Sequence, residues 1–251
     1  MTLSDTAVYA LRLGDDALIL SHRLAEWSSR APALEEDIAL SNIALDLLGQ
    51  ARALLTYAGE VEGAGRSEDD LAYLRAENEF ANCQLVEQPN GDFGVTMARQ
   101  LFFSAYQLEL YRHLAGSADP TLAAIAAKAV KEVAYHVDHA AGWVVRLGDG
   151  TDESHRRMQA AVERMWPFTH ELFETDEVAE RLAAAGAGVD PAALRPTWDQ
   201  RIAAVLTEAT LDRPADGWRP TGGRRGVHSE YLGFLLAEMQ HLHRSHPGAT
   251  W

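Results

Sequence analysis

Two stretches of this chain carry carboxylates and imidazoles at spacings that suit metal ligands. Glu132 and His136 stand four residues apart with His139 one turn further on, while Glu238 and His241 form a Glu-x-x-His pair. Residues three or four apart share a helix face, so a carboxylate could bridge two ions while an imidazole binds one of them. A two-metal site in a four-helix bundle needs such a pair from each of two helices and a Glu from each of the other two.

Neither stretch supplies that complete set. No cluster of ligands on the earlier helices completes the stretch that contains Glu132, His136 and His139. A Glu–His contact along one helix, with His139 at the surface, is the simpler interpretation of that stretch. The second is a single pair in a chain with 10 His, and with His243 and His246 nearby it is typical of a hydrated helix end. On an earlier helix, Leu47 and Gln50 hold the pair spacing, but leucine cannot bind a metal and glutamine is a poor, neutral substitute.

A row of polar residues follows the edge of the same helix. Asn42, Asp46 and Gln50 recur at intervals of one turn. Buried polar groups must be hydrogen-bonded, so an inward-facing row predicts a polar network where metals would otherwise lie. Its partners would be polar residues of the first helix, namely Arg12, Asp15, Asp16 and His22. A solvated helix edge is the alternative.

A third candidate is the glycine-rich stretch from Thr221 to Gly226, which contains Arg224 and Arg225. Guanidinium groups suit phosphate and carboxylate, and glycines let backbone N–H groups approach an anion. This stretch could contact the phosphates of a nucleotide-bearing substrate or acidic groups of a partner subunit, or it could be an ordinary basic loop. It lacks the Walker spacing, so it does not predict an ATP site.

Composition limits the class of protein. The 251 residues are 47% hydrophobic and 24% charged, as in soluble globular proteins, and the net charge is −15. Such acidity argues against nucleic acid or an anionic membrane as the main partner and suits either a basic partner subunit or simple solubility. Cys83 is the only cysteine, and the N-terminus lacks a signal-peptide pattern. We expect a cytoplasmic protein without a disulfide, a membrane span or a thiolate metal site.

The elements expected to position these residues are helices. Apolar residues recur at helical spacing over four core helices, about 4–29, 33–58, 92–115 and 119–147, and peripheral helices follow within 151–251. Asp119 and Pro120 mark a helix start, and Gly59, Gly63 and Gly65 are expected to end the second helix. Pro167 is expected to kink or end a later helix, and Pro196 to break the next. No stretch alternates like a strand. We expect a single all-α domain over residues 1–251 with a four-helix core.

Several motifs then carry a family resemblance along the whole chain. They are Arg12-Leu-Gly-Asp15, Glu26-Trp27, Arg30-Ala-Pro32, Leu45-Asp-Leu-Leu-Gly-Gln-Ala-Arg52, Glu87-Gln-Pro-Asn-Gly91, Lys131-Glu132, Tyr135-His136, Arg146-Leu-Gly, Thr221-Gly-Gly and Ala237-Glu-Met-Gln240. Together they resemble the structural C subunits of phenylacetyl-CoA 1,2-epoxidases, which are ferritin-like members of the bacterial multicomponent monooxygenases.

The resemblance implies a ferritin-like fold and a role in aerobic phenylacetate degradation. In that family a catalytic A subunit holds the di-iron site, and a reductase with flavin, iron–sulfur and NADPH delivers electrons. The C subunit is regarded as structural, and a small B subunit links the pairs that the two larger chains form. The expected partners are therefore the A and B subunits, with no cofactor in this chain.

The resemblance also places the family's ligand positions on this sequence. They fall on Ala17, Leu47, Gln50, Ser104, Val133 and His136. Only His136 keeps a ligand type, and the loss of carboxylates at Leu47 and Val133 would defeat a two-metal site. We therefore expect a non-catalytic subunit. The alternatives are an oxygenase that uses Glu132, His136, His139 and Asp46, and a helical adaptor unrelated to oxygenation.

Overall fold

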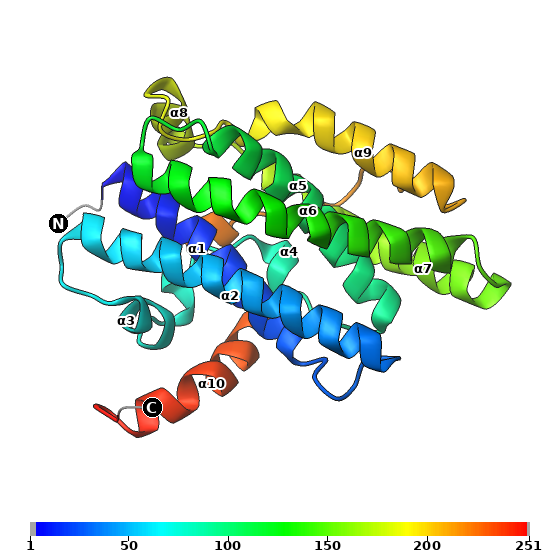
Figure 1. The fold of residues 1–251 in the computed structure, drawn as a ribbon, viewed down its shortest axis with the longest axis horizontal. Helices are drawn as coiled ribbons and strands as arrows, with labels where there is room; N and C mark the ends of the chain where they lie inside the picture. Colours follow the sequence, from blue (N-terminus) through cyan, green and yellow to red (C-terminus); the bar gives the residue numbers. More distant parts are fainter. Residues whose placement is uncertain (1–3, 250–251) are drawn as a thin grey trace. The chain divides into compact units, whose positions relative to one another are not determined.

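The structure is a computed structural model that describes residues 4–249, and within that range it contains helices and no strand (Figure 1). The all-α prediction is confirmed. The described chain divides into two compact units, one running to Pro89 and resuming at Gly222, the other spanning Asn90–Thr221. The C-terminal residues thus fold with the first unit instead of extending the peripheral helices. A single domain over 1–251 stays a prediction.

The first unit is built on a pair of long antiparallel helices, α1 (Asp5–Ala25) and α2 (Leu34–Glu62), which pack along one another (Figure 1). Among the described helices α2 alone is long and apolar enough to cross a membrane by length and composition, a test that core helices of soluble proteins also pass. The remaining helices are short: α3 (Glu68–Tyr73), α4 (Gln84–Glu87), α10 (Glu230–Ser245) and 3₁₀ turns at Glu77–Glu79 and Gly223–Arg225.

The ends of the two long helices correct the prediction. α1 ends at Ala25 rather than near residue 29, because the chain turns there and Ser29 has a positive φ of 64°. α2 continues past Gly59 and ends at Gly63, whose φ of 70° forms a left-handed C-cap. Gly59 serves close packing instead, since a Cβ there would lie 2.2 Å from the Arg66 carbonyl oxygen.

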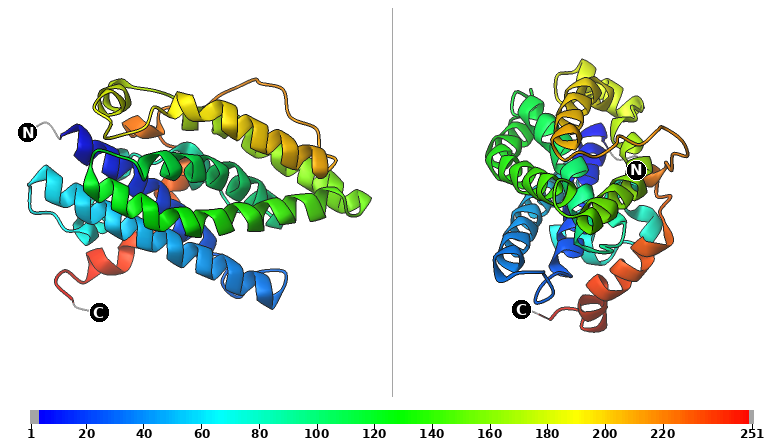
Figure 2. Two further views of the ribbon diagram at one scale, coloured as in Figure 1. Left: turned by 45° about the horizontal axis from the view of Figure 1, so that its top comes forward. Right: turned by 90° about the vertical axis from the view of Figure 1, so that its right-hand side faces the viewer.

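The second unit has its own long pair, α5 (Phe93–Leu114) and α6 (Pro120–Gly148), which run side by side (Figure 2). Asp119 caps α6 as predicted, because its carboxylate accepts hydrogen bonds from the Thr121 and Leu122 amides at 3.0 Å. The later elements are α7 (Asp152–Met165), a 3₁₀ helix (Trp166–Phe173), α8 (Glu177–Ala184), a 3₁₀ turn (Pro191–Leu194) and α9 (Arg195–Glu208).

The two later prolines behave differently. Pro167 ends α7, as predicted, and the chain continues as a 3₁₀ helix. Pro196 does not break a helix: it occupies the first turn of α9, where a missing N–H leaves no hydrogen bond unmade. The start of α9 is fixed by packing, since the Trp198 indole is fully buried and its Nε1–H donates to the Phe102 carbonyl of α5 at 2.9 Å.

Candidate functional site

Three of the six positions implied by the resemblance lie in the first unit. Ala17 belongs to α1, whereas Leu47 and Gln50 stand three residues apart on α2. All three are buried, with 0% of Ala17 and Leu47 and 4% of Gln50 exposed. The face on which a Glu-x-x-His pair would stand therefore presents a buried leucine, which brings no donor atom.

The other three positions lie in the second unit. Ser104 on α5 is buried, and its hydroxyl donates to the Gln100 carbonyl within the same helix at 2.6 Å. Val133 and His136 stand three residues apart on α6 with 0% and 1% exposed. His136 is thus the only imidazole or carboxylate among the six positions, and its neighbour in the pair is an aliphatic side chain.

The donor atoms present do not fit a two-metal carboxylate site. Within residues 4–249, no group of three or more His, Cys, Asp and Glu is placed to hold a metal ion. Glu132 of the alternative ligand set lies 3.9 Å from the Lys128 ammonium, and the His139 ring lies 6.0 Å from that of Tyr135. The alternative set of Asp46, Glu132, His136 and His139 thus forms no metal cluster in the described chain. That this chain carries no metal stays a prediction.

The polar row of α2 does not lie uniformly inward. Asn42 is exposed, Asp46 is half-buried and Gln50 is buried, so the row runs from the surface into the core. Its expected partners on α1, Asp15 and Asp16, make their hydrogen bonds with segments outside α2. The prediction that these two carboxylates would serve the α2 row was wrong. The Glu-x-x-His pair of α10, Glu238 and His241, is exposed, as a hydrated helix end would be.

A buried ion pair joins Asp15 of α1 to Arg75, which follows α3. The Asp15 side chain is 0% exposed and that of Arg75 is 3% exposed. The Asp15 carboxylate accepts from both terminal guanidinium nitrogens of Arg75, one of them at 2.9 Å, and from the Ala81 amide at 2.8 Å. The guanidinium also lies over the Phe80 ring at 4.1 Å. The pair therefore fixes the chain between α3 and α4 against α1.

Asp16 forms a second pair, with Arg224. An Arg224 nitrogen donates to the Asp16 carboxylate at 2.7 Å, and the Cys83 amide donates to the same carboxylate at 2.7 Å. Burial raises the pKa of Asp16, and the adjacent guanidinium opposes that rise. Arg224 also donates to the carbonyls of Arg12 and Ala81. Arg224 is thus engaged within the chain, whereas Arg225 is exposed, and the predicted anion or partner contact of these two residues stays a prediction.

The third pair is Glu87 of α4 with His228, both side chains 0% exposed. His228 Nδ1 lies 2.9 Å from the Glu87 carboxylate and Nε2 lies 2.9 Å from the Phe80 carbonyl oxygen. The side-chain amide of Asn82 and the backbone amide of Ser229 donate to the same carboxylate. Each ring nitrogen of His228 thus lies within hydrogen-bond distance of an oxygen, and the ring is held from both sides.

The second and third of these pairs hold the C-terminal segment (residues 222–249) in the first unit. Arg23 of α1 adds to them by donating to the carbonyls of Glu87 and Tyr231. Sequence reasoning missed this arrangement, although Asp15, Glu87 and the glycines before Arg224 stand in motifs that it singled out. The sequence did place these charged residues next to apolar stretches, which can indicate burial. No regular spacing, however, shows which charged residue pairs with which.

The geometry defines the class first: an all-α protein with long, paired helices whose interiors are buried. Residues 2–251 match the family of the phenylacetic acid catabolic protein. The chain is also 51% identical to the C subunit of the 1,2-phenylacetyl-CoA epoxidase of Escherichia coli (strain K12), over 249 residues that cover 99% of this chain and 100% of the relative. The chain belongs to the phenylacetic acid catabolic protein family, and its fold is the all-α, ferritin-like one.

Proposed function

We propose that this chain is the non-catalytic structural subunit of a phenylacetyl-CoA epoxidase, which pairs with and stabilises a di-iron catalytic subunit in aerobic phenylacetate degradation. The observation that supports the proposal is that Leu47 and Val133, which the family resemblance aligns with bridging carboxylates, are fully buried aliphatic side chains. The relative's name, which makes it the C subunit of an epoxidase, supports a role inside a complex.

The chemistry of the reaction then lies in other chains. The irons belong to the catalytic A subunit, and flavin, iron–sulfur and NADPH belong to the reductase. A small B subunit is expected to bridge such pairs. The net charge of −15 suits protein partners better than nucleic acid or an anionic membrane, and the compartment is the cytoplasm.

Omitting this chain tests the proposal. The catalytic subunit is expressed with and without it, and the soluble yield and the NADPH-dependent epoxidation of phenylacetyl-CoA are measured with the reductase. We expect the catalytic subunit to be insoluble or inactive alone and active as the co-purified pair. Full epoxidation by the catalytic subunit with the reductase, in the absence of this chain, would refute the structural role.

A further inference from the structure

Helix α2 is apolar on two opposite sides. Its buried side contributes several leucines and Ile43 to the core of the first unit. On the other side four large apolar residues recur at helical spacing and remain in solvent: Leu34, Ile38, Leu45 and Leu48 are 72%, 54%, 64% and 41% exposed. A helix that is hydrophobic all round is normally buried all round. The exposed stripe therefore has the character of an interface.

Gly49 lies beside this stripe. It is exposed in the middle of α2, and a Cβ built there would meet no other atom within 4 Å. Glycine at such a position costs about 1 kcal/mol of helix stability relative to alanine. Because Gly49 carries no side chain, another backbone can approach α2 closely beside Leu45 and Leu48.

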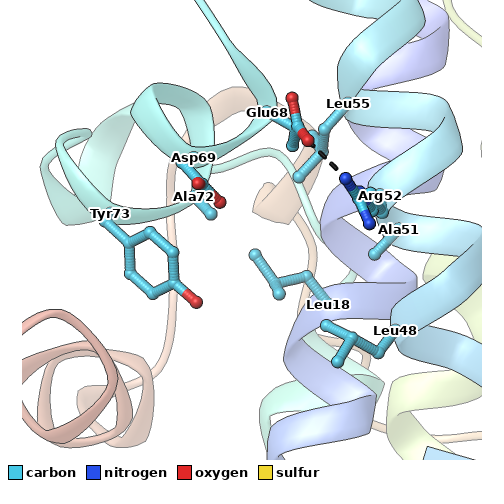
Figure 3. Close-up of a pocket in the computed structure, with 9 residues that line it drawn as sticks. All are labelled: Leu18, Leu48, Ala51, Arg52, Leu55, Glu68, Asp69, Ala72 and Tyr73. Carbon is cyan, nitrogen blue, oxygen red and sulfur yellow. Dashed lines mark hydrogen bonds and ion pairs between the residues drawn. The ribbon is translucent and has the colours of Figure 1, made fainter. Parts of the chain in front are cut away.

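A pocket of about 320 Å³ adjoins the stripe, because Leu48 lines both (Figure 3). Leu18 and Leu55 contribute apolar walls, and Tyr73 lies on the side opposite Leu18 (Figure 3). Glu68 and Asp69 of α3 bring carboxylates to the pocket; Glu68 is paired with Arg52, which also lines it, at 3.2 Å. An apolar wall with carboxylates at its rim suits the aliphatic stem and cationic end of a lysine or arginine.

The charge around this surface distinguishes between three possible binding partners: a second copy of the chain, an anionic membrane and a basic helix. The first turn of α2 carries Glu35, Glu36 and Asp37, and Glu68 and Asp69 lie at the pocket. A second copy of this acidic chain would bring like charges to the interface, and an anionic membrane would be repelled in the same way. A helix with an apolar face flanked by Lys or Arg complements the surface.

We propose that the exposed face of α2, formed by Leu34, Ile38, Leu45, Leu48 and Gly49 with the adjoining pocket, binds an amphipathic helix of the partner subunit. In the bound state, a Lys or Arg of that helix enters the pocket beside Asp69. This inference rests on the proposed function, since it assigns the surface through which the chain pairs with its catalytic partner.

Two variants with matched controls test the surface by titration against the purified catalytic subunit. Leu45→Glu is paired with Leu242→Glu, an identical change at a 53% exposed leucine of α10. Gly49→Leu is paired with Gly142→Leu, since Gly142 is also an exposed helical glycine without neighbours within 4 Å. Leu45→Glu and Gly49→Leu are expected to weaken binding by at least about 30-fold, and the controls to leave it within about 3-fold. The thermal unfolding midpoint confirms that each variant folds.

The outcomes separate the two proposals. If Leu45→Glu and Gly49→Leu bind the catalytic subunit as tightly as the wild type, the proposed binding surface is wrong, but the proposed pairing function is unaffected. Wild-type protein that does not bind the catalytic subunit would overturn the pairing function and the surface with it. Self-association, or binding to phosphatidylglycerol vesicles, that is lost in Leu45→Glu would assign the face to a different occupant and also overturn the inference.

Discussion

Replacing Asp15 by leucine is expected to lower the free energy of unfolding by about 3–5 kcal/mol, measured by urea denaturation. The reason is the burial of its partner: the Arg75 side chain is 3% exposed, so its charge would remain in the core without a counter-ion. The Ala81 amide would lose its acceptor at the same time. Removing one partner of a buried ion pair lowers the free energy of unfolding strongly, because the other charge stays buried and unpaired. Replacing both partners by apolar residues changes it far less.

The matched control is an exposed pair in the same unit. Arg52 lies 3.2 Å from Glu68, and its side chain is 76% exposed, so Arg52→Ala should change stability by less than about 1 kcal/mol. The double variant Asp15→Leu/Arg75→Met should recover most of the loss, since it leaves no unpaired charge. A loss below about 1 kcal/mol for Asp15→Leu alone would show that the pair is not shielded from solvent.

Replacing Glu87 by leucine is expected to have a comparable effect, about 3–5 kcal/mol, and a local one as well. Glu87 is the hydrogen-bond partner of the buried His228 and the acceptor of the Asn82 and Ser229 groups. Its loss removes the acceptor of the Ser229 amide and one partner each of the Asn82 and His228 side chains. The C-terminal segment (residues 222–249) should then detach more readily than the rest of the first unit.

Limited proteolysis followed by mass spectrometry measures that local effect. In Glu87→Leu, cleavage within the C-terminal segment should precede cleavage of α1 and α2. Glu230→Leu is the control, because Glu230 belongs to the same segment but is exposed and forms none of the three buried pairs. Unchanged protease resistance of the segment in Glu87→Leu would contradict the role assigned to this pair.

The long helices could be predicted from sequence because their signals are local. Apolar spacing located α1, α2, α5 and α6, and Asp119 with Pro120 marked the start of α6 to within a residue. The errors were local too. Gly59 resembled a helix end, yet only a positive φ, found at Gly63, makes glycine a C-cap, and Pro196 sits where a helix tolerates proline.

The buried pairs could not be predicted in that way. Asp15 and Arg75 are 60 residues apart, and Asp16 and Arg224 are 208 apart. No helical or strand periodicity links such positions, so Asp15 and Asp16 were assigned to the nearest polar row instead of to their partners. The six positions compared with a metal site came from the family resemblance, and the structure adds that Ala17, Leu47, Gln50, Ser104, Val133 and His136 are all buried.

The central claim is that this chain supports an epoxidase without a catalytic site of its own. The most direct measurement is the iron content of the chain purified alone after growth with iron, together with oxygen consumption and product formation when phenylacetyl-CoA, NADPH and the reductase are supplied. We predict well below one iron per chain and no epoxidation above the rate of the reductase alone. Two irons per chain with oxygen-dependent epoxide formation would contradict the account.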